Sequence, residues 1–338
     1  MLRLGLTVGL LKVHASLVML ALVQTACLVF DFGVSWALIR RSYPGIRLSL
    51  GSFDWAVVRR IFSFSLYVLL LTAGARLTFE TDALVIGAFM GVGPIAFYAV
   101  ANSIVVYLME FIVAIAAVVA PMATKLNTEG KPAELREIFL KWSKVALSLT
   151  LMVGLFLVIL GPQFIGWWIG PSFEQPAGQV LQILVLSSFV FLPVRGVALP
   201  TLMGLGKPRL PAAAFLVAGV LNLLLSIALV GPLGLIGVAL GTAFPNVLLA
   251  AVVLAAACRE LKIGVLAYLR YVVPRATFGA VPVLALLLWF RLGVQVHGLV
   301  GLVGAGLAMF LLFGLTWVFF VYRNDPYVDL RGRFRARA

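Results

Sequence analysis

Apolar residues occur along this chain in runs of about 20 or more positions, and short polar segments separate the runs. A helix of about 20 apolar residues crosses the ~30 Å hydrocarbon core of a membrane. The pattern therefore predicts nine membrane-spanning helices, preceded by an apolar stub at residues 2–11 that is too short to cross. The predicted spans are residues 15–39, 62–89, 93–121, 145–169, 177–204, 209–230, 233–257, 266–290 and 298–322.

Two of the polar segments carry apolar and basic residues at helical spacing. Residues 52–61 place Ser52 or Asp54 at a helix start, and residues 131–144 interleave Lys, Arg, Leu and Trp. Both segments predict amphipathic helices that lie at the inner membrane interface. The alternative is an ordinary solvated linker in each place.

The composition supports a chain that folds in lipid. Hydrophobic residues make up 63% of the sequence, charged residues 11%, and the mean hydropathy is +1.13. Soluble domains contain about 45–50% apolar and about 25% charged residues. Because a soluble fold of 338 residues has no interior large enough for this apolar surface, we expect an all-α integral membrane protein.

The formal net charge of +14 indicates membrane orientation and not nucleic-acid binding, because the basic residues lie in short gaps between spans. Of the 26 Lys and Arg residues, 21 fall on one side of the predicted topology. The positive-inside rule places that side in the cytoplasm, with the C-terminus cytoplasmic and the N-terminus external. The longest external segment, residues 161–176, has no room for a catalytic domain; its Trp167 and Trp168 are typical of the aromatic belt at a membrane surface.

Ionisable residues inside spans are costly in lipid and are the candidates for function. Arg195 is the strongest, because Pro193 and Pro200 flank it and are expected to kink or break the helix. A cation in a discontinuous helix is a common anion site in transporters. The alternative is an arginine paired with a carboxylate of a neighbouring helix for structure alone. The other candidates are Asp31, Arg76, Glu80, Asp82 and Glu110.

Three of these candidates lie close together in the second predicted span. Arg76 and Glu80 are four residues apart and share a helix face, whereas Asp82 points roughly the opposite way. An intrahelical Arg76–Glu80 pair would ease insertion of the span, and a free guanidinium would suit a diphosphate cargo. Glu80, Asp82, Glu110 and Asp31 are candidates for supporting the arginines or for binding coupling protons.

The sequence offers no pattern for a cofactor, a metal or a catalytic centre. The segment around Gly204, Gly206 and Lys207 is not a phosphate-binding loop, because Pro208 replaces the required Ser or Thr. His14 and His297 have no second ligand at metal spacing. We therefore expect a non-enzymatic membrane protein without a cofactor.

Several strings together resemble a known family. Four segments look like parts of polysaccharide flippases: FETDALVIGAFMGVGPIAFYAVANSI (79–104), LMGLGKPRLP (202–211), GPLGLIGVALGTAF (231–244) and WWIGPSFEQPAGQVLQIL (167–184). These proteins belong to the multidrug/oligosaccharidyl-lipid/polysaccharide exporter superfamily, and the match runs over most of the chain in the family's order.

The resemblance implies a two-lobed fold of 12 to 14 helices around a central cavity. By this alignment residues 1–61 are the end of the first lobe with an interfacial linker helix, 62–323 are the second lobe, and 324–338 are a basic cytoplasmic tail. About five N-terminal helices are expected to be missing. The chain is expected to lie in the inner membrane of a bacterial cell as a multi-pass protein.

The resemblance further implies alternating access for a lipid-linked oligosaccharide on an undecaprenyl diphosphate carrier, with Arg195 and Arg76 in the cavity. Membrane lipids and the polysaccharide polymerase machinery are the other expected partners, and nucleic acid is not one. The alternatives are a drug/cation antiporter or lipid II flippase of the same superfamily, a membrane glycosyltransferase, polymerase or ligase, and an inactive fragment.

Overall fold

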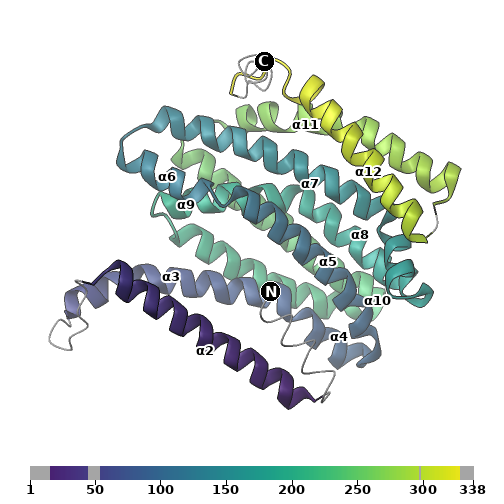
Figure 1. Cartoon of the computed structure of the whole chain (residues 1–338), viewed down its shortest axis with the longest axis horizontal. Coiled ribbons are helices and arrows are strands. Elements are labelled where there is room, and N and C mark those ends of the chain that lie inside the picture. The colour runs from purple at the N-terminus through teal and green to yellow at the C-terminus, as the bar shows by residue number, and fades with distance from the viewer. Residues whose placement is uncertain (1–15, 45–53, 297, 328–338) are drawn as a thin grey trace. The chain divides into compact units, whose positions relative to one another are not determined.

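The computed structural model describes residues 16–44, 54–296 and 298–327, and within these ranges the regular elements are all helical (Figure 1). Three of the elements are short π-helical segments labelled η. The elements are α2 Leu17–Ser42, α3 Trp55–Glu80, α4 Asp82–Met90, α5 Gly93–Ala116, α6 Val119–Thr128, α7 Pro132–Trp168, α8 Pro171–Pro193, η2 Val194–Ala198, α9 Leu199–Gly204, α10 Arg209–Glu260, α11 Val265–Trp289, η3 Phe290–Val294, α12 Gly298–Thr316 and η4 Trp317–Val321. The apolar stub at 2–11, His14, Ser52, His297 and tail residues 328–338 lie outside the described ranges.

The chain forms two compact units, Met1–Ile61 and Phe62–Ala338. Helix α2, in the first unit, is exposed along most of its length, as expected of a helix that lipid surrounds. All the candidate residues except Asp31 belong to the second unit.

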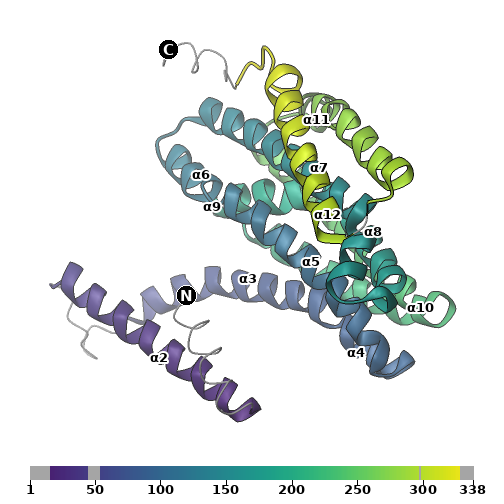
Figure 2. The same cartoon turned by 45° about the vertical axis from the view of Figure 1, so that its right-hand side comes forward.

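Helix α7 is central to the second unit. It packs against α5, α6, α8, α11 and α12, so that α11 and α12 lie on one side of it and α5 and α8 on the other (Figures 1 and 2). Two apolar clusters meet along α7. The larger one includes Phe139 and Leu181, and the smaller one joins Leu160 to Leu287 and Leu302 of α11 and α12. A helix buried on several sides in this way fixes its neighbours relative to one another.

Seven helices of the described ranges are long and apolar enough to cross a membrane, which confirms the predicted class of fold. They cover the predicted spans except 62–89, which falls on α3 and α4, two helices separated at Thr81. Predicted spans 209–230 and 233–257 form the single element α10, which turns at Gly234 (φ 57°, ψ −134°).

The two segments predicted as amphipathic helices are helical, but they are continuous with the spans that follow. Asp54 accepts a hydrogen bond from the Ala56 amide (2.8 Å) directly before α3, as the sequence predicts for a helix start. Residues 132–144 form the first turns of α7, which continues to Trp168 without interruption. Their placement at the membrane interface stays a prediction.

Segments predicted on the same side of the membrane lie together. One hollow is lined by residues of three segments that are predicted to be cytoplasmic. They are Leu126, Lys131, Leu205, Glu260 and Lys262. At the other end of the unit, α7 and α11 finish where α8 and α12 begin, and residues of all these ends line a second region of hollows. The spatial grouping agrees with the predicted alternation of the spans.

Three helices at the first of these ends stop in the same way. The amides of Lys131, Lys207 and Ile263 each donate to the carbonyl oxygen five residues earlier, at 2.8–2.9 Å, which is the Schellman ending of a helix. Residues 126–132 and 202–208 share the pattern Leu-x-x-x-Gly-Lys-Pro, with the glycine at positive φ and the proline at or just before the start of the next helix. The local sequence therefore reverses the chain at these two points.

Helices α3 and α10 approach each other more closely than side chains would permit. A Cβ atom on Gly74 would lie 2.5 Å from the backbone carbon of Phe215, and one on Gly219 would lie 2.9 Å from the Gly74 carbonyl oxygen. Small residues allow such backbone contacts between membrane helices. Gly74 thus sets the distance between α3 and the first half of α10.

We expect Gly74→Ala to destabilise the protein by about 1–3 kcal/mol, because the added methyl group meets backbone atoms that have no rotamer to change. Thermal unfolding of the detergent-solubilised protein measures the effect. Gly304→Ala is the matched control, since nothing lies within 4 Å of a Cβ at Gly304. Equal unfolding temperatures for the two variants would contradict the close approach.

Candidate functional site

Arg195 lies on a membrane-spanning helix that stays wound but changes its geometry. Between α8 and α9 the chain forms the π-helical turn η2, so of the expected kink or break the helix shows no break. The guanidinium carbon of Arg195 lies 5.5 Å from the ring centre of Phe215 on α10. Its buried Nε has no hydrogen-bond partner, and no ion pair within 4.0 Å joins Arg195 to a carboxylate of the described chain. The alternative of a purely structural ion pair therefore lacks its carboxylate.

Arg76 and Glu80 form the predicted pair on one face of α3. Their nearest side-chain atoms are 3.7 Å apart, and the side chains are 71% and 64% exposed within the protein. An exposed pair of this kind contributes little to stability. A shared cavity for Arg76 and Arg195 stays a prediction.

Asp82 is the buried member of the acidic candidates. It is 1% exposed, which agrees with the prediction that it faces away from the exposed Glu80. Its Oδ2 accepts hydrogen bonds from the Tyr98 hydroxyl (2.5 Å) and the Thr242 hydroxyl (2.9 Å), and the Asn222 amide donates to the same Thr242 hydroxyl (2.8 Å). Its Oδ1 is buried without a hydrogen-bond partner. We call these four residues the Asp82 cluster.

The Asp82 cluster joins four separate pieces of helix. Asp82 begins α4, Tyr98 belongs to α5, and Asn222 and Thr242 stand on the two sides of the Gly234 turn in α10. An isolated buried carboxylate is costly unless it is neutralised or paired. The cluster supplies neutral donors only, so a proton or a small cation is needed to neutralise an ionised Asp82.

Glu110 and Asp31 are exposed on α5 and α2. Among the described residues of the second unit, no ion pair within 4.0 Å joins Glu110 to Arg195 or Arg76. Their supporting or coupling roles therefore stay predictions.

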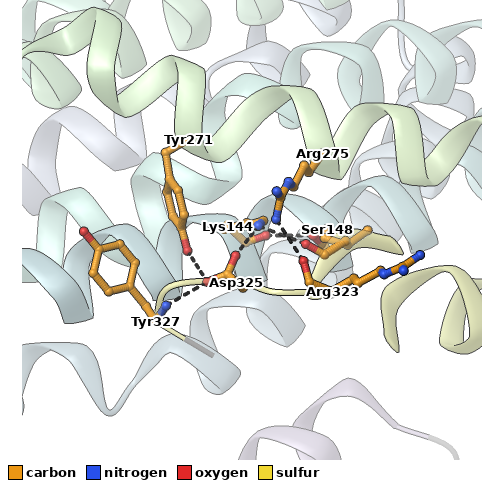
Figure 3. A network of polar contacts seen from close by, with 8 residues as sticks. Lys144, Ser148, Tyr271, Arg275, Arg323, Asp325 and Tyr327 are labelled. Carbon is orange, nitrogen blue, oxygen red and sulfur yellow. Dashed lines mark hydrogen bonds and ion pairs between the residues drawn. The ribbon is translucent and has the colours of Figure 1, made fainter. Parts of the chain in front are cut away.

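A second buried polar network connects α7 to the segment after the last helix (Figure 3). Lys144 of α7 forms an ion pair with Asp325, and both side chains are fully buried. The Lys144 ammonium also donates to the Val321 carbonyl (3.0 Å), and it lies 4.9 Å from the ring centres of Tyr271 and Tyr322. The cation thus has a counter-charge, a carbonyl and two aromatic faces.

Asp325 is held as firmly on its other side. The Tyr271 hydroxyl (2.8 Å) and the Tyr327 amide (3.0 Å) donate to its Oδ1, while Arg275 of α11 donates to the Arg323 carbonyl (3.1 Å). Burial acts to raise the pKa of Asp325, but hydrogen bonds from Lys144, the Tyr327 amide and Tyr271 outweigh it and hold that pKa below its usual value. The start of the predicted basic tail is therefore docked against α7 and α11.

Comparisons with known proteins agree with this architecture. A sequence profile for the family described as polysaccharide biosynthesis proteins matches residues 5–177, about half of the chain. The chain belongs to this polysaccharide biosynthesis protein family.

Two curated relatives come from archaea. The chain is 23% identical over 237 residues to a protein of Haloferax volcanii described as the probable low-salt glycan biosynthesis flippase Agl15, covering 70% of this chain and 48% of that one. It is 24% identical over 228 residues to an uncharacterised membrane protein of Methanocaldococcus jannaschii, covering 66% and 43% of the two chains. The chain thus spans about half the length of the curated relatives it matches.

A solved structure shares the fold. The lipid II flippase MurJ, in an inward closed conformation, superposes with a TM-score of 0.66 at 14% identity, over 94% of this chain and 66% of that chain. The predicted resemblance to flippases of the exporter superfamily is confirmed, and the protein is a multi-pass membrane protein of the polysaccharide biosynthesis family.

Sequence reasoning did not identify the partners of Asp82 or the pair between Lys144 and Asp325. Lys144 was expected to be one of the cytoplasmic basic residues, whereas it is buried in this family member. One signal was present: Asp325 is one of two acidic residues, with Asp329, between Arg323 and Arg331 in a segment expected to be basic. Asn222 and Thr242 are isolated polar residues in long apolar runs, which is the corresponding signal for the Asp82 cluster.

We expect Asp325→Asn to destabilise the protein by about 3–5 kcal/mol, because it leaves the buried Lys144 ammonium without its counter-charge. Thermal unfolding in detergent measures the loss. Adding Lys144→Met to Asp325→Asn removes the unpaired charge and is expected to restore most of the stability. Glu129→Gln, which breaks an exposed ion pair with Lys131, is the matched control and is expected to have little effect.

The same prediction has a pH dependence with a definite sign. The folded-state pKa of Asp325 is lowered, so its contribution is complete above the unfolded-state pKa near 4 and is lost as the pH falls through the folded value. The difference between the wild type and Asp325→Asn is therefore expected to disappear at low pH. A difference that persists there unchanged would contradict the ion pair as its cause.

Proposed function

We propose that this protein takes part in moving a lipid-linked oligosaccharide across the cytoplasmic membrane for polysaccharide biosynthesis, by alternating access. The family, the named glycan flippase among the relatives and the flippase fold support a transporter over a membrane glycosyltransferase, polymerase or ligase. The membrane is proposed to be the inner membrane of a bacterial cell, with the C-terminus cytoplasmic, as the distribution of Lys and Arg predicts.

The observation that carries the proposal is the Arg195 guanidinium within an apolar helix, which has no carboxylate partner among the described residues. Arginine stays charged when buried, and its planar group binds two phosphate oxygens at once. A charged residue at this depth in a membrane helix is costly and is normally retained for a ligand or a partner. We assign Arg195 to the diphosphate of the carrier, of which undecaprenyl diphosphate is the expected form.

Arg76 is a second candidate contact for the same diphosphate. Its exposed guanidinium forms an ion pair with Glu80 at 3.7 Å, and a strong anion competes well for a pair in that setting. Polysaccharide polymerase machinery is the proposed partner that would use the delivered glycan.

A lipid II flippase is a second candidate function, favoured by the superposition on MurJ. The two functions share a diphosphate-linked glycan and differ in the sugar. A drug/cation antiporter has less support, because Arg195 is a cation in a place where a cationic drug would need a carboxylate.

Mass spectrometry of lipid-linked glycans tests the function in cells that lack the gene. We expect complete carrier-linked repeat units to accumulate while surface polymer is lost, because synthesis precedes transfer. Incomplete units would contradict a flippase and indicate a glycosyltransferase, whereas accumulated lipid II would identify the second candidate function. An unchanged profile would indicate an inactive fragment.

In the same cells, we expect a gene copy encoding Arg195→Ala to restore less than about a tenth of the surface polymer, since a lost bidentate charge contact is worth about tenfold or more. Arg195→Lys is expected to restore an intermediate amount. Arg270→Ala, an exposed arginine of α11, is the matched control and is expected to restore all of it. Equal polymer from Arg195→Ala at equal protein abundance would exclude this residue from transport.

We further propose that the Asp82 cluster binds the coupling cation. Its unpartnered Oδ1 is the available ligand atom, and Tyr98 and Thr242 fix the orientation of the carboxylate. Binding there would alter the contacts of α4 and α5 with both parts of α10, which is the kind of coupling that alternating access requires.

We expect Asp82→Asn to lower transport at least about tenfold, because the isosteric amide keeps the size of the side chain but removes its negative charge. Transport into vesicles under sodium and proton gradients identifies the cation. Glu80→Gln is the matched control, with an exposed carboxylate two residues away. Full activity of Asp82→Asn under both gradients would refute the coupling role.

A further inference from the structure

Five of the six glutamines of this chain gather at one end of the second unit. They come from the end of α7, the start of α8 and the segment after η3, and they line two open hollows that share Glu174 and Arg291. The five are Gln163, Gln175, Gln179, Gln182 and Gln295. We call the two hollows together the glutamine hollow.

The size of the glutamine hollow suits a small ligand. Its two parts have volumes of about 460 Å³ and 480 Å³, within the ~300–1,000 Å³ range of ligand pockets. Amide groups that face hydrocarbon would lack hydrogen-bond partners, so a surface this rich in amides is a wet one. Trp167, at the end of α7, is exposed on its rim, as expected at a membrane surface.

Helical spacing organises the amides. Gln175, Gln179 and Gln182 are separated by four and three residues, so they form a stripe along one face of α8. The Gln182 amide is oriented by donating to the Val158 carbonyl (2.7 Å). Gln163 also lines the hollow, and its buried Oε1 has no hydrogen-bond partner. That oxygen is an unused hydrogen-bond acceptor beside the hollow.

Two irregular backbone positions complete the hollow. Arg291 lies in the π-helical turn η3 and donates to the Ile159 carbonyl (3.2 Å), which uses one of its five N–H donors. Gln295 adopts the left-handed conformation (φ 50°, ψ 61°), which is strained for a residue with a Cβ. Strain of this kind concentrates at binding sites.

The chemistry of the glutamine hollow points to a saccharide. Sugar hydroxyls both donate and accept hydrogen bonds, and so does an amide side chain. The apolar face of a pyranose ring packs on an aromatic ring such as Trp167. A phosphate would need several cations, whereas Arg291 is the one cationic residue among those that line the hollow.

We propose that the glutamine hollow binds the glycan part of the cargo on the side of the membrane opposite the cytoplasm. The inference rests on the proposed function, since a glycan flippase is what delivers a saccharide to that side. The hollow would hold the sugar after the diphosphate has crossed, at a position separate from Arg195.

Binding of soluble saccharides tests the inference directly. The full chain is reconstituted in nanodiscs, and saturation-transfer difference NMR is recorded with malto-, chito- and galacturono-oligosaccharides, with glycerophosphate as the phosphate probe. We expect at least one oligosaccharide to bind, and Trp167→Ala and Gln179→Ala each to weaken its binding roughly tenfold. Gln179 is exposed, so its truncation leaves folding intact.

The chain supplies matched controls for both substitutions. Trp168→Ala removes the neighbouring tryptophan, which stacks on Phe164 and does not line the hollow, and Gln24→Ala removes the sixth glutamine. Both are expected to bind like the wild type. Saccharide binding that is equally strong in all four variants, binding of glycerophosphate alone, or no binding at all would each overturn the inference.

The outcome is separable from that of the proposed function. A wild-type protein that moves lipid-linked glycan in cells but binds no soluble saccharide would refute the glutamine hollow and leave the flippase proposal standing. Unchanged lipid-linked glycans in cells that lack the gene, together with Trp167-dependent binding, would refute the flippase proposal and leave a saccharide site.

Discussion

Hydrocarbon offers no hydrogen-bond partners, so each polar group in a membrane-spanning helix must find a partner within the protein. Several buried hydroxyl groups satisfy this constraint locally. Thr78, Thr150 and Thr201 each donate to the carbonyl oxygen four residues earlier, at 2.7–2.9 Å. Such side chains need no hydrogen-bond partner on a neighbouring helix. Against this background, the buried polar atoms without partners mark the places where a ligand, a proton or a rearrangement has to complete the structure.

The two buried polar networks answer the constraint in different ways. Around Lys144 and Asp325 both charges are matched, and the aromatic rings and the Val321 carbonyl satisfy what remains of the cation. A network in which both charges are matched holds one arrangement, which suits its place between α7, α11 and the segment after the last helix. Around Asp82 one carboxylate oxygen stays unsatisfied. An incomplete network changes its energy when it takes up a cation, and that property suits a coupling site.

The class of fold followed from the sequence because run length and charge asymmetry are local properties. The apolar runs predicted the membrane helices, and the alternation of basic segments agrees with the segments that lie together in space. The predicted helices were incomplete where the local geometry of a helix changes. Thr81 separates α3 from α4 within one predicted span, and a π-helical turn carries Arg195 where the prolines were expected to kink or break the helix.

The candidate site was predictable only in part. Arg195 and Asp82 were identified as candidates because burying a charged side chain in lipid is costly, and a charge inside an apolar run is visible in one sequence. The residues around Asp82 were not predicted, since Asn222 and Thr242 come from 140 and 160 residues farther along the chain and only the fold brings them together. The glutamine hollow depends on the same kind of long-range contact, between α7, α8 and the end of α11.

The described π-helical segments share one feature. η2 carries Arg195, η3 carries Arg291, and the last residue of η4, Val321, offers its carbonyl to Lys144. π-helical turns are rare and cluster at functional sites, because the wider turn shifts the residues that follow and leaves carbonyl groups for other donors. Each of the three turns therefore either carries a cationic side chain or offers a carbonyl oxygen to one. The same backbone device positions a cation at three separate points of the second unit, and the two points where the cation is an arginine are those proposed to meet the cargo.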